Sequence, residues 1–286
     1  MKLYMMLSYC RTPLIQNPVL VELMDILRQQ NIQVDIGIAQ DIVMQPGCMA
    51  SLYDLYILKS HSDLWLSLAG VLHEQGARLL NPYPACQEVT NKIVATQRMQ
   101  TAGIPAPESW VTGDLNLLMP IAAEKSLIIK PHIGGRGMGV HVIHNPHELS
   151  LITPPQEPLL IQEYIPGAEL KIYVIGERVF AVRKPFNSTS FMIAGQPARV
   201  SQEAREIALK CGRVFGLGLY GLDIIESANG PVVVDLNYFP SYKGVPGAAK
   251  LIADYIMSYA SGKVPELETH NFIGREVNES QIAIQR

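Results

Sequence analysis

Charged residues are scarce in this 286-residue chain: they make up 17% of it and leave a net charge of −3, against about 25% in an average soluble protein. That balance argues against a protein that wraps nucleic acid, since such proteins are usually basic overall. No apolar run approaches the roughly 20 residues that cross a membrane. The N-terminal MKLYMMLSYC lacks a small-residue cleavage site and predicts a first strand rather than a signal peptide. We therefore expect a cytoplasmic protein with neither a nucleic-acid nor a membrane partner.

The sequence also lacks a C-x-x-C motif and a G-x-G-x-x-G motif after its first expected strand. The four cysteines form no C-x-x-C pair, which favours small buried hydrophobes in a reducing compartment over disulfides. No G-x-G-x-x-G follows the first expected strand, so a dinucleotide site there is not expected. Hydrophobic residues make up 48% of the chain, which is enough for a core. The length predicts about two domains, or one domain of intertwined lobes.

Apolar runs and helical periodicity alternate over residues 1–82 and predict a small parallel α/β domain. A single helix is predicted over 85–102, followed by α+β structure in which strands dominate from 127 onward. A helix is predicted over 201–216, then a hairpin around Asn229-Gly230 and a last helix over 246–262. The predicted divisions are an α/β domain at 1–84, a small lobe at 85–165, a large lobe at 166–264 and a polar tail at 265–286.

The first chemical motif is SLIIKPHIGGRGMGV, residues 126–140. A strand delivers Lys130, and a loop with Gly134, Gly135, Gly137 and Gly139 follows. Glycines allow backbone N–H groups to approach phosphate oxygens, and a nearby lysine adds a point charge. The alternative is an ordinary flexible hairpin with a surface lysine.

The second motif is LLIQEYIPGAEL, residues 159–170. An apolar strand ends in Gln162-Glu163-Tyr164-Ile165, and Glu169 follows a Pro-Gly turn. A linker between two lobes can offer backbone groups to an adenine edge, and a carboxylate nearby can hold ribose hydroxyls. The alternative is a solvated strand end.

The third motif places cations in apolar strands. Lys171, Arg183 and Lys184 lie within KIYVIGERVFAVRKP, residues 171–185. Cations in such strands usually need an anionic partner, which a phosphate or carboxylate substrate would supply. The alternative is an edge strand that is protected by charge.

The fourth motif is a pair of aspartates on the predicted hairpin. Asp223 and Asp235 lie on its two strands, and Asn237 shares a face with Asp235 because side chains alternate along a strand. Two carboxylates and an amide oxygen suit Mg²⁺ bridging nucleotide phosphates. The alternative is two exposed hairpin aspartates.

Together, in this order, the motifs resemble the ATP-grasp superfamily over residues 1–262, with N-K at a helix start, K-P on a strand, a Gly-rich loop, the Q-E-Y-I hinge and D-x-N. The resemblance implies an ATP-grasp fold with an N-terminal pre-ATP-grasp α/β domain. It also implies that Lys92 and Lys130 hold ATP phosphates, that the 134–139 loop, including Met138, covers them, and that Lys130 also lies beside the adenine.

The resemblance implies roles for the remaining motifs as well. Gln162 would face the adenine amino group, the hinge at Glu163, Tyr164 and Ile165 would pair the ring, and Glu169 would take the ribose. The D-x-N pair and the preceding aspartate (Asp223, Asp235, Asn237) would bind one or two Mg²⁺, with Mn²⁺ a possible substitute. The catalytic residues would be Arg183, stabilising the transferring phosphoryl group, and Lys171.

Two branches of the superfamily compete. The first resembles the ribosomal-protein glutamate ligase and related carboxylate–amine ligases, which join a carboxylate to an amine through an acyl phosphate. The second resembles the inositol tris/tetrakisphosphate kinases, in DLYILKSHSD, KIYVIGERVFAVRKP and VDLNYFPSYKGV. The ligases usually carry E-x-N where this chain has Asp235, as the kinases do. We take the ligase as the first hypothesis and the kinase as the alternative; a third is a non-catalytic nucleotide-binding regulator.

The same comparison implies a site for a small anionic substrate, a carboxylate or a phosphate, with an amine as a second substrate. The candidate substrate-binding residues are Arg11, Lys59, Lys171, Arg183, Lys184, Ser241, Lys243 and Gly244. A homo-oligomer is compatible with the resemblance, and the sequence does not identify the acceptor.

Overall fold

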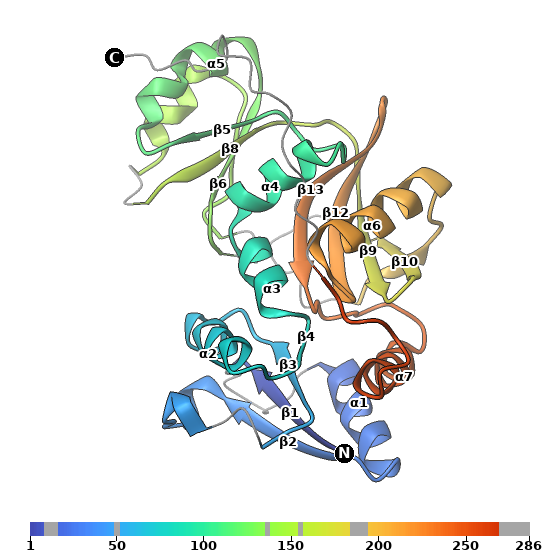
Figure 1. The fold of residues 1–286 in the computed structure, drawn as a ribbon. Helices are drawn as coiled ribbons and strands as arrows, with labels where there is room; N and C mark the ends of the chain where they lie inside the picture. The colour runs from blue at the N-terminus through green and yellow to red at the C-terminus, as the bar shows by residue number, and fades with distance from the viewer. Residues whose placement is uncertain (9–16, 49–51, 135–137, 154–156, 184–193, 269–286) are drawn as a thin grey trace.

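The computed structural model describes residues 1–8, 17–48, 52–134, 138–153, 157–183 and 194–268, and these form three sheets (Figure 1). The first sheet is parallel, and the other two are antiparallel. No helix in these ranges is long and apolar enough to cross a membrane.

The N-terminal domain is the predicted parallel α/β domain. Its elements, in chain order, are β1 (Lys2–Leu7), α1 (Pro18–Gln29), β2 (Gln33–Ile38), short 3-10 turns at Ala39–Asp41 and Pro46–Cys48, β3 (Leu55–Lys59), α2 (Asp63–Glu74) and β4 (Leu79–Leu80). The strand order is β2-β1-β3-β4. The central strands β1 and β3 are almost entirely buried, which explains why their sequences are continuous apolar runs rather than alternating ones.

The prediction of a single helix over residues 85–102 is wrong. The chain forms two helices, α3 (Tyr83–Thr90) and α4 (Lys92–Thr101), which meet at Asn91. Asn91 has extended backbone angles, and its side-chain oxygen accepts hydrogen bonds from the N–H groups of Ile93 and Val94 at 3.1 and 3.3 Å. Asparagine competes for helical N–H groups in this way, so it begins a new helix rather than continuing the old one.

The second sheet has the order β5-β8-β6-β7. Its strands are β5 (Ser109–Thr112), β6 (Leu127–Pro131), β7 (His141–Ile143) and β8 (Leu159–Glu163), and the 3-10 turns η3 (Leu115–Leu118) and η4 (Pro146–Leu151) and the helix α5 (Met119–Glu124) cover one face. We call this unit the small lobe. The sequence analysis did not identify β5, α5 or the two turns, because each is only four to six residues long and so too short to show a helix or strand period.

The third sheet has the order β11-β10-β9-β12-β13. Its strands are β9 (Ala168–Ile175), β10 (Arg178–Arg183), β11 (Gln196–Ala198), β12 (Leu219–Ser227) and β13 (Gly230–Tyr238). The helix α6 (Gln202–Phe215) packs on one face, and α7 (Ala248–Ala260) contacts both β9 and α1. We call this sheet with α6 and α7 the large lobe. The predicted strands, hairpin and both helices of this region are confirmed.

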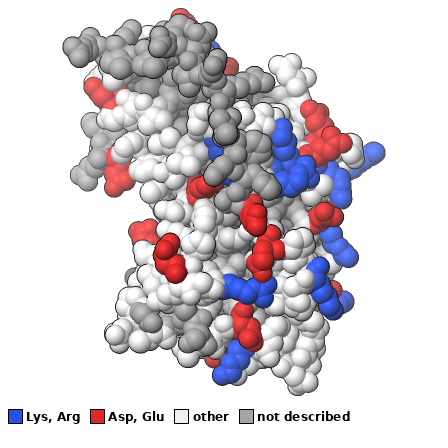
Figure 2. Space-filling model, viewed as in Figure 1, with Lys and Arg blue, Asp and Glu red and all other residues white. Residues whose placement is uncertain are grey.

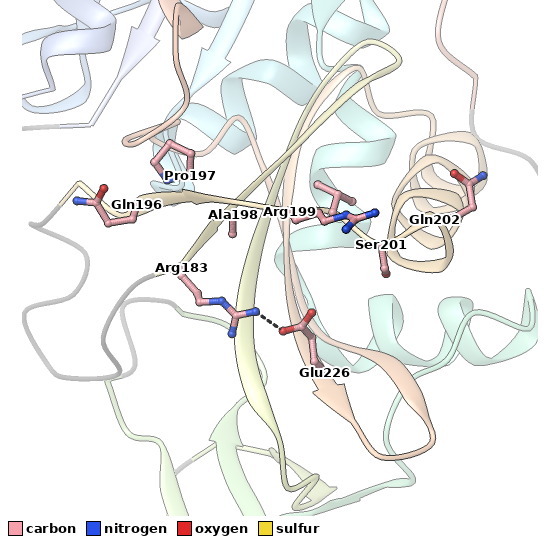
Figure 3. A pocket seen from close by; sticks show the side chains of 9 residues that line it. Arg183, Gln196, Pro197, Ala198, Arg199, Ser201, Gln202 and Glu226 are labelled. Carbon is pink, nitrogen blue, oxygen red and sulfur yellow. Dashed lines mark hydrogen bonds and ion pairs between the residues drawn. The ribbon is translucent and has the colours of Figure 1, made fainter.

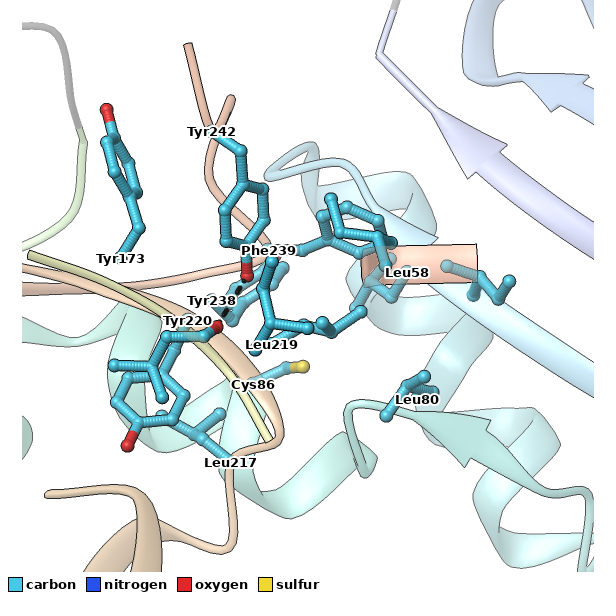
Figure 4. Packing of buried hydrophobic residues seen from close by; sticks show 14 of the residues in the cluster. Leu58, Leu80, Cys86, Tyr173, Leu217, Leu219, Tyr220, Tyr238, Phe239 and Tyr242 are labelled. Atoms are coloured by element: carbon cyan, nitrogen blue, oxygen red, sulfur yellow. Dashed lines mark hydrogen bonds between the residues drawn. The ribbon is translucent and has the colours of Figure 1, made fainter. Parts of the chain in front are cut away.

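The buried apolar residues of the described ranges form two separate cores. One continuous cluster joins the N-terminal domain, α3, α4 and the large lobe, and Figure 4 shows Leu58, Cys86 and Tyr238 of these three parts packed in it. The second cluster lies entirely within the small lobe. The predicted segment 85–165 therefore contributes to both cores, since α3 and α4 pack in the first.

Asn81 is a buried polar residue that links two parts of the first core by hydrogen bonds. Its side-chain oxygen accepts from the N–H groups of Gly218 and Leu219 at 2.8 and 3.0 Å, and its amide nitrogen donates to the Leu219 carbonyl at 2.7 Å. The N-terminal domain is thereby joined to the start of β12 by hydrogen bonds from a side chain to the backbone, as well as by apolar packing.

Candidate active site

The β12–β13 hairpin presents its two aspartates side by side. Asp223 and Asp235 are directly paired across the two antiparallel strands, but the next residue, Ile224, pairs with Val233. Val234 is thus the extra residue of a β-bulge, and its carbonyl is turned out of the ladder. The bulge keeps Val233 in the core while Asp235 and Asn237 share the opposite face, with Asn237 Nδ2 donating to Asp235 Oδ2 at 2.9 Å.

Lys130 of the small lobe reaches this bulge. Its Nζ donates to the Val234 carbonyl at 2.8 Å, and the residue is only 8% exposed. Val234 lies in the middle of β13, the edge strand of its sheet, and at the bulge its carbonyl serves as the acceptor that a buried ammonium needs. Lys130 therefore lies where the small lobe meets the large lobe.

Lys92, the first residue of α4, closes the same corner. Its Nζ lies 3.2 Å from Asp235 Oδ1 and donates to the Gly134 carbonyl at 3.0 Å, while its backbone N–H donates to the His132 carbonyl at 2.8 Å. The N-cap by Asn91 sets the direction in which this lysine leaves the helix. Lys92 thus connects the start of the Gly-rich loop with the metal-binding candidate Asp235.

Lys171 lies on the other side of Asp223. In the register of β9 and β12 the two residues are opposite each other, and Lys171 Nζ lies 2.8 Å from Asp223 Oδ1 and 2.9 Å from Glu169 Oε1. Lys92, Lys130 and Lys171 therefore stand against Glu169, Asp223 and Asp235, three positive charges against three negative ones. Without a ligand, this cluster balances its own charge.

The pKa values of the two aspartates move in opposite directions. Burial opposes ionisation of Asp235, but Lys92 and Lys130 outweigh it and hold the pKa of Asp235 below its usual value. Burial raises the pKa of Asp223 despite the opposing effect of Lys171. Burial lowers the pKa of Lys130, against the effect of Asp235, whereas Asp223 and Glu169 overcome burial to raise the pKa of Lys171.

The donor set fits a hard divalent cation. Asp223, Asp235 and Asn237 offer carboxylate and amide oxygens on one face of the hairpin. Mg²⁺ typically binds one or two such protein oxygens and completes its coordination with water molecules and substrate phosphates. No group of three or more His, Cys, Asp or Glu residues within the described ranges forms a self-sufficient metal site.

The adenine-binding candidates lie at the base of the small lobe. Gln162 is buried on the same face of the sheet as Lys130, and its Nε2 lies within 3.4 Å of Thr96 Oγ1 and 3.3 Å of Ser109 Oγ. The hinge backbone is partly used, since the N–H groups of Glu163 and Tyr164 donate to the Glu108 and Ser126 carbonyls. Thr96 and Ser109 were not among the sequence candidates, because single hydroxyls in a helix and a short strand carry no pattern.

Arg183 does not join the cluster, and this expectation is corrected. Its neighbour Val182 pairs with Lys171, so Arg183 points to the opposite face of the sheet. There Arg183 Nη2 forms an ion pair with Glu226 Oε2 at 2.6 Å, half-exposed beside the start of α6 (Figure 3). Strand alternation therefore places Lys171 in the cluster and Arg183 on the other face of the sheet.

The remaining substrate candidates lie after β3 and β13. Lys59 ends β3 with its Nζ 5.4 Å from the centre of the Phe239 ring, and the Ser241 carbonyl accepts from Asn17 Nδ2 at 3.0 Å. Gly244 has φ +93°, and a Cβ there would lie 2.5 Å from the Gly195 carbonyl, so only glycine fits. Lys243 is half-buried in the same segment.

Several predicted residues lie outside the described residues or at their limit. Arg11, Gly135, Gly137 and Lys184 lie outside them. Gly134 and Gly139, which flank the undescribed part of the Gly-rich loop, have φ of +127° and +70°, and Met138 is exposed.

On the face shown in Figure 2, basic and acidic side chains are interspersed over the large lobe.

Comparison with known proteins accounts for this arrangement. The model of the RimK-like ATP-grasp domain matches residues 89–257, which include every described residue of the lysine–carboxylate cluster. The chain belongs to the RimK-like ATP-grasp family. The superfamily and fold implied by the sequence motifs are thereby confirmed.

Relatives of this RimK-like protein are distant but similar in length. A probable alpha-L-glutamate ligase of Shewanella sp. (strain W3-18-1) is 24% identical over 259 residues, covering 82% of this chain and 85% of that protein. A RimK domain ATP-grasp protein from Sphaerobacter thermophilus superposes with a TM-score of 0.74 at 16% identity, covering 90% of this chain and all of that one. The ATP-grasp ligase PsnB, solved with a minimal precursor, Mg and ADP, gives a TM-score of 0.65 at 18% identity over 91% and 97% of the two chains. At these identities the solved structures show the shared fold.

Proposed function

We propose that this RimK-like protein is an ATP- and Mg²⁺-dependent carboxylate–amine ligase that forms an amide or peptide bond through an acyl phosphate. The observation that carries the proposal is the convergence of Lys92 and Lys130 with Asp235 at the contact between the two lobes. The family match supports an ATP-grasp enzyme, and the relatives named as ligases support the ligase branch over the kinase.

The charge balance suits a nucleotide that arrives with its metal. Three lysines and three carboxylates already neutralise one another. Free ATP would therefore disturb the balance with its own negative charge, whereas each Mg²⁺ that accompanies it offsets two of its negative charges. Phosphate oxygens would take over Lys92 and Lys130, and the carboxylate oxygens of Asp235 and Asp223, with Asn237, would be left for the metal.

The rest of the nucleotide follows from the position of these groups. Lys130 and Gln162 share the inner face of the small-lobe sheet, so the adenine would lie along this face between the phosphates and the hinge. Within the described part of the chain the Ile165 N–H has no hydrogen-bond partner, which supports its role as a donor to the ring. Glu169 would bind the ribose after releasing Lys171 to a phosphate or to the acceptor carboxylate.

The reaction would proceed in two displacements. A carboxylate oxygen of the acceptor attacks the γ-phosphorus of ATP, the bond to the β–γ bridging oxygen breaks, and ADP leaves with its electron pair. The amine nitrogen then attacks the acyl carbon, the carbon–oxygen bond to phosphate breaks, and the amine loses a proton to solvent as the amide forms. Lys130, Lys92 and Lys171 would offset the charge that develops on the phosphoryl oxygens. Bound Mg²⁺ would add further neutralisation of that charge.

An isotope experiment tests the proposal directly. The protein is incubated with ATP, Mg²⁺, a pool of amino acids and a pool of carboxylic acids labelled with ¹⁸O in the carboxylate, and products are measured by mass spectrometry. An acyl-phosphate ligase transfers one ¹⁸O into inorganic phosphate and forms a product lighter than its two substrates by one water. The matched controls are Asp235→Asn, which should lose both signals, and Asp254→Asn at an exposed pair with Lys250, which should keep them.

The kinase alternative has its own result in the same experiment when inositol phosphates are added. An inositol phosphate that becomes heavier by one phosphoryl group, without release of inorganic phosphate, would overturn the ligase proposal. The observation that keeps this alternative in view is Asp235 itself, which stands where the ligases that the sequence resembles usually have glutamate. No turnover with either pool, together with nucleotide binding that Asp235→Asn alters, would favour the non-catalytic regulator.

A further inference from the structure

A largely buried amide lies on the inner face of the small-lobe sheet. Gln162 of β8 is directly paired with Ser109 of β5 on one side and with Ile128 of β6 on the other. Side chains alternate along a strand, so Gln162 shares this face with Lys130, whereas its neighbour Ile161 packs in the small-lobe core. Gln162 is only 2% exposed. An amide has a donor end and an acceptor end, so its orientation decides which ligand group it can bind.

The hydroxyl proton of Ser109 fixes that orientation. Ser109 Oγ donates to the Pro107 carbonyl at 2.8 Å. Two oxygens at this distance need a proton between them, and a serine hydroxyl has only one to give. Toward Gln162, Ser109 Oγ is therefore only an acceptor, and it accepts from Gln162 Nε2 at 3.3 Å. The donor end of the amide accordingly faces β5.

Thr96 holds the same end of the amide from outside the small lobe. Its Oγ1 accepts from Gln162 Nε2 at 3.4 Å. Thr96 is 5% exposed and belongs to α4, which packs in the larger of the two cores. The two protons of the Gln162 amide nitrogen are thus both used, one on each hydroxyl.

The acceptor end of the amide is left for a ligand. Within the described residues Gln162 Oε1 has no hydrogen-bond partner, and it is not among the completely buried unpaired atoms, so a ligand can reach it. An unpaired acceptor on a largely buried side chain costs free energy until a donor binds it. The inner face of the small lobe therefore presents an acceptor, on the same face as the Lys130 ammonium, to a ligand that lies along it.

We infer that Ser109 and Thr96 are positioning residues that select the nucleotide base: by turning the Gln162 carbonyl toward the ligand, they favour a purine with an amino group at position 6 over one with a carbonyl there. The amino group of adenine is a donor, whereas the carbonyl of guanine or hypoxanthine is an acceptor that would face a second acceptor. The inference rests on the nucleotide site of the proposed function, but not on which reaction follows binding.

Titration calorimetry tests this selection without requiring turnover. The full chain is titrated in Mg²⁺ with ADP and with IDP, whose bases, adenine and hypoxanthine, differ at position 6 and at the adjoining ring nitrogen. We expect the wild type to bind ADP at least about 100-fold more tightly than IDP. Ser109→Ala should reduce this ratio about tenfold, chiefly by binding IDP more tightly, because the freed amide can turn its nitrogen toward the hypoxanthine carbonyl.

Matched variants separate positioning from a structural role. Ser109→Ala is expected to fold because the Pro107 carbonyl keeps a second donor, Gln100 Nε2, at 2.7 Å. Thr96→Val removes the other hydroxyl and should shift the ratio in the same direction, whereas Ser109→Thr keeps a hydroxyl and should keep the wild-type ratio. Ser150→Ala, at an exposed serine of the same lobe, should leave both affinities unchanged.

Two results would overturn the positioning role. One is a ratio that stays constant in both Ser109→Ala and Thr96→Val, including the case in which ADP and IDP are weakened equally, as a purely structural role predicts. The other is equal affinity of the wild type for the two nucleotides.

These results are distinguishable from failure of the proposed function. If the ratio shifts as expected but the isotope experiment yields no amide, the positioning role stands and the ligase reaction is wrong. If the isotope experiment yields labelled phosphate and an amide while the ratio does not shift, the ligase stands and the positioning role is wrong. Binding of neither nucleotide by the wild type would overturn both.

Discussion

Replacing Asp235 by asparagine should destabilise the nucleotide-free protein and at the same time strengthen its binding of metal-free ATP. Asp235 is the counter-ion of Lys92, at 3.2 Å, and the main opposing charge for buried Lys130. Asparagine keeps the shape and removes the charge. The variant therefore leaves two neighbouring ammonium groups without their carboxylate.

The size of the effect follows from the geometry. At 3.2 Å and an effective dielectric constant of about 20, one ion pair is worth about 5 kcal/mol. The two side chains are 14% and 24% exposed, so solvent screening lowers this. A net loss of about 2–4 kcal/mol is in line with a broken, largely buried pair, and at about 2 °C per kcal/mol it lowers the melting temperature by about 4–8 °C.

The assay is thermal unfolding in EDTA, with and without ATP. ATP should raise the melting temperature of Asp235→Asn more than that of the wild type, because phosphates replace the lost carboxylate and no longer meet its repulsion. Asp254→Asn, at the exposed Lys250 pair, should melt within about 1 °C of the wild type. A melting temperature of Asp235→Asn equal to the wild type, or an equal response to ATP, would refute the assignment of Asp235 as the counter-ion of the phosphate-binding lysines.

Three further outcomes follow from the structure. The pKa of Asp235 in the folded protein lies below its value near 4 in the unfolded chain, so ionised Asp235 stabilises the fold above that pH and this contribution is lost as the pH falls through the folded-state pKa. The difference in free energy of unfolding between the wild type and Asp235→Asn, measured in urea, should therefore narrow between about pH 5 and about pH 2. A difference that stays constant over this range would contradict the argument. Asn81→Ala leaves backbone groups of Leu219 and its neighbour unsatisfied in the core and should cost about 3 kcal/mol in urea unfolding, whereas a cost below about 1 kcal/mol would mean that water replaces the side chain. Gly212→Ala places a Cβ 2.3 Å from Tyr220 Oη and should cost about 2–3 kcal/mol, and the extra cost should shrink in a Tyr220→Phe background; equal costs in both backgrounds would exclude the clash as its cause.

Much of the fold was predictable from local patterns. Buried parallel strands such as β1 and β3 are continuous apolar runs, and α6 has a capping serine at Ser201 and a glycine in the left-handed conformation at Gly216. Where the pattern failed, a single polar residue decided the outcome. Asn91 reads as one more residue of a long helix until its side chain is seen to cap α4.

The sequence indicated which residue types would gather at the candidate site better than it indicated the face of the sheet to which each side chain points. The D-x-N motif was identified because unpaired carboxylates in apolar strands are costly, and Lys130 because a Gly-rich loop follows it. In the structure Asp235 pairs with Lys92, Asp223 pairs with Lys171, and Lys130 donates to the Val234 carbonyl. Arg183 was misplaced because sequence alternation does not reveal which strand pairs with which, and only the register of β9 with β10 shows that it points to the other face. The bulge at Val234 has no signal at all in the apolar run Val232–Val234, although its carbonyl anchors Lys130.

The division into two hydrophobic cores has a mechanical consequence. Lys92 and Asp235 belong to the larger body, whereas Lys130 belongs to the small lobe, which packs around its own apolar cluster. The hydrogen bonds that link the lobe to the body here run from Lys130 to the Val234 carbonyl, from Lys92 to the His132 and Gly134 carbonyls, and from Gln162 to Thr96. A nucleotide bound to both Lys92 and Lys130 would add a removable link between two parts with separate apolar cores, so its binding would strengthen their contact and its release would weaken it.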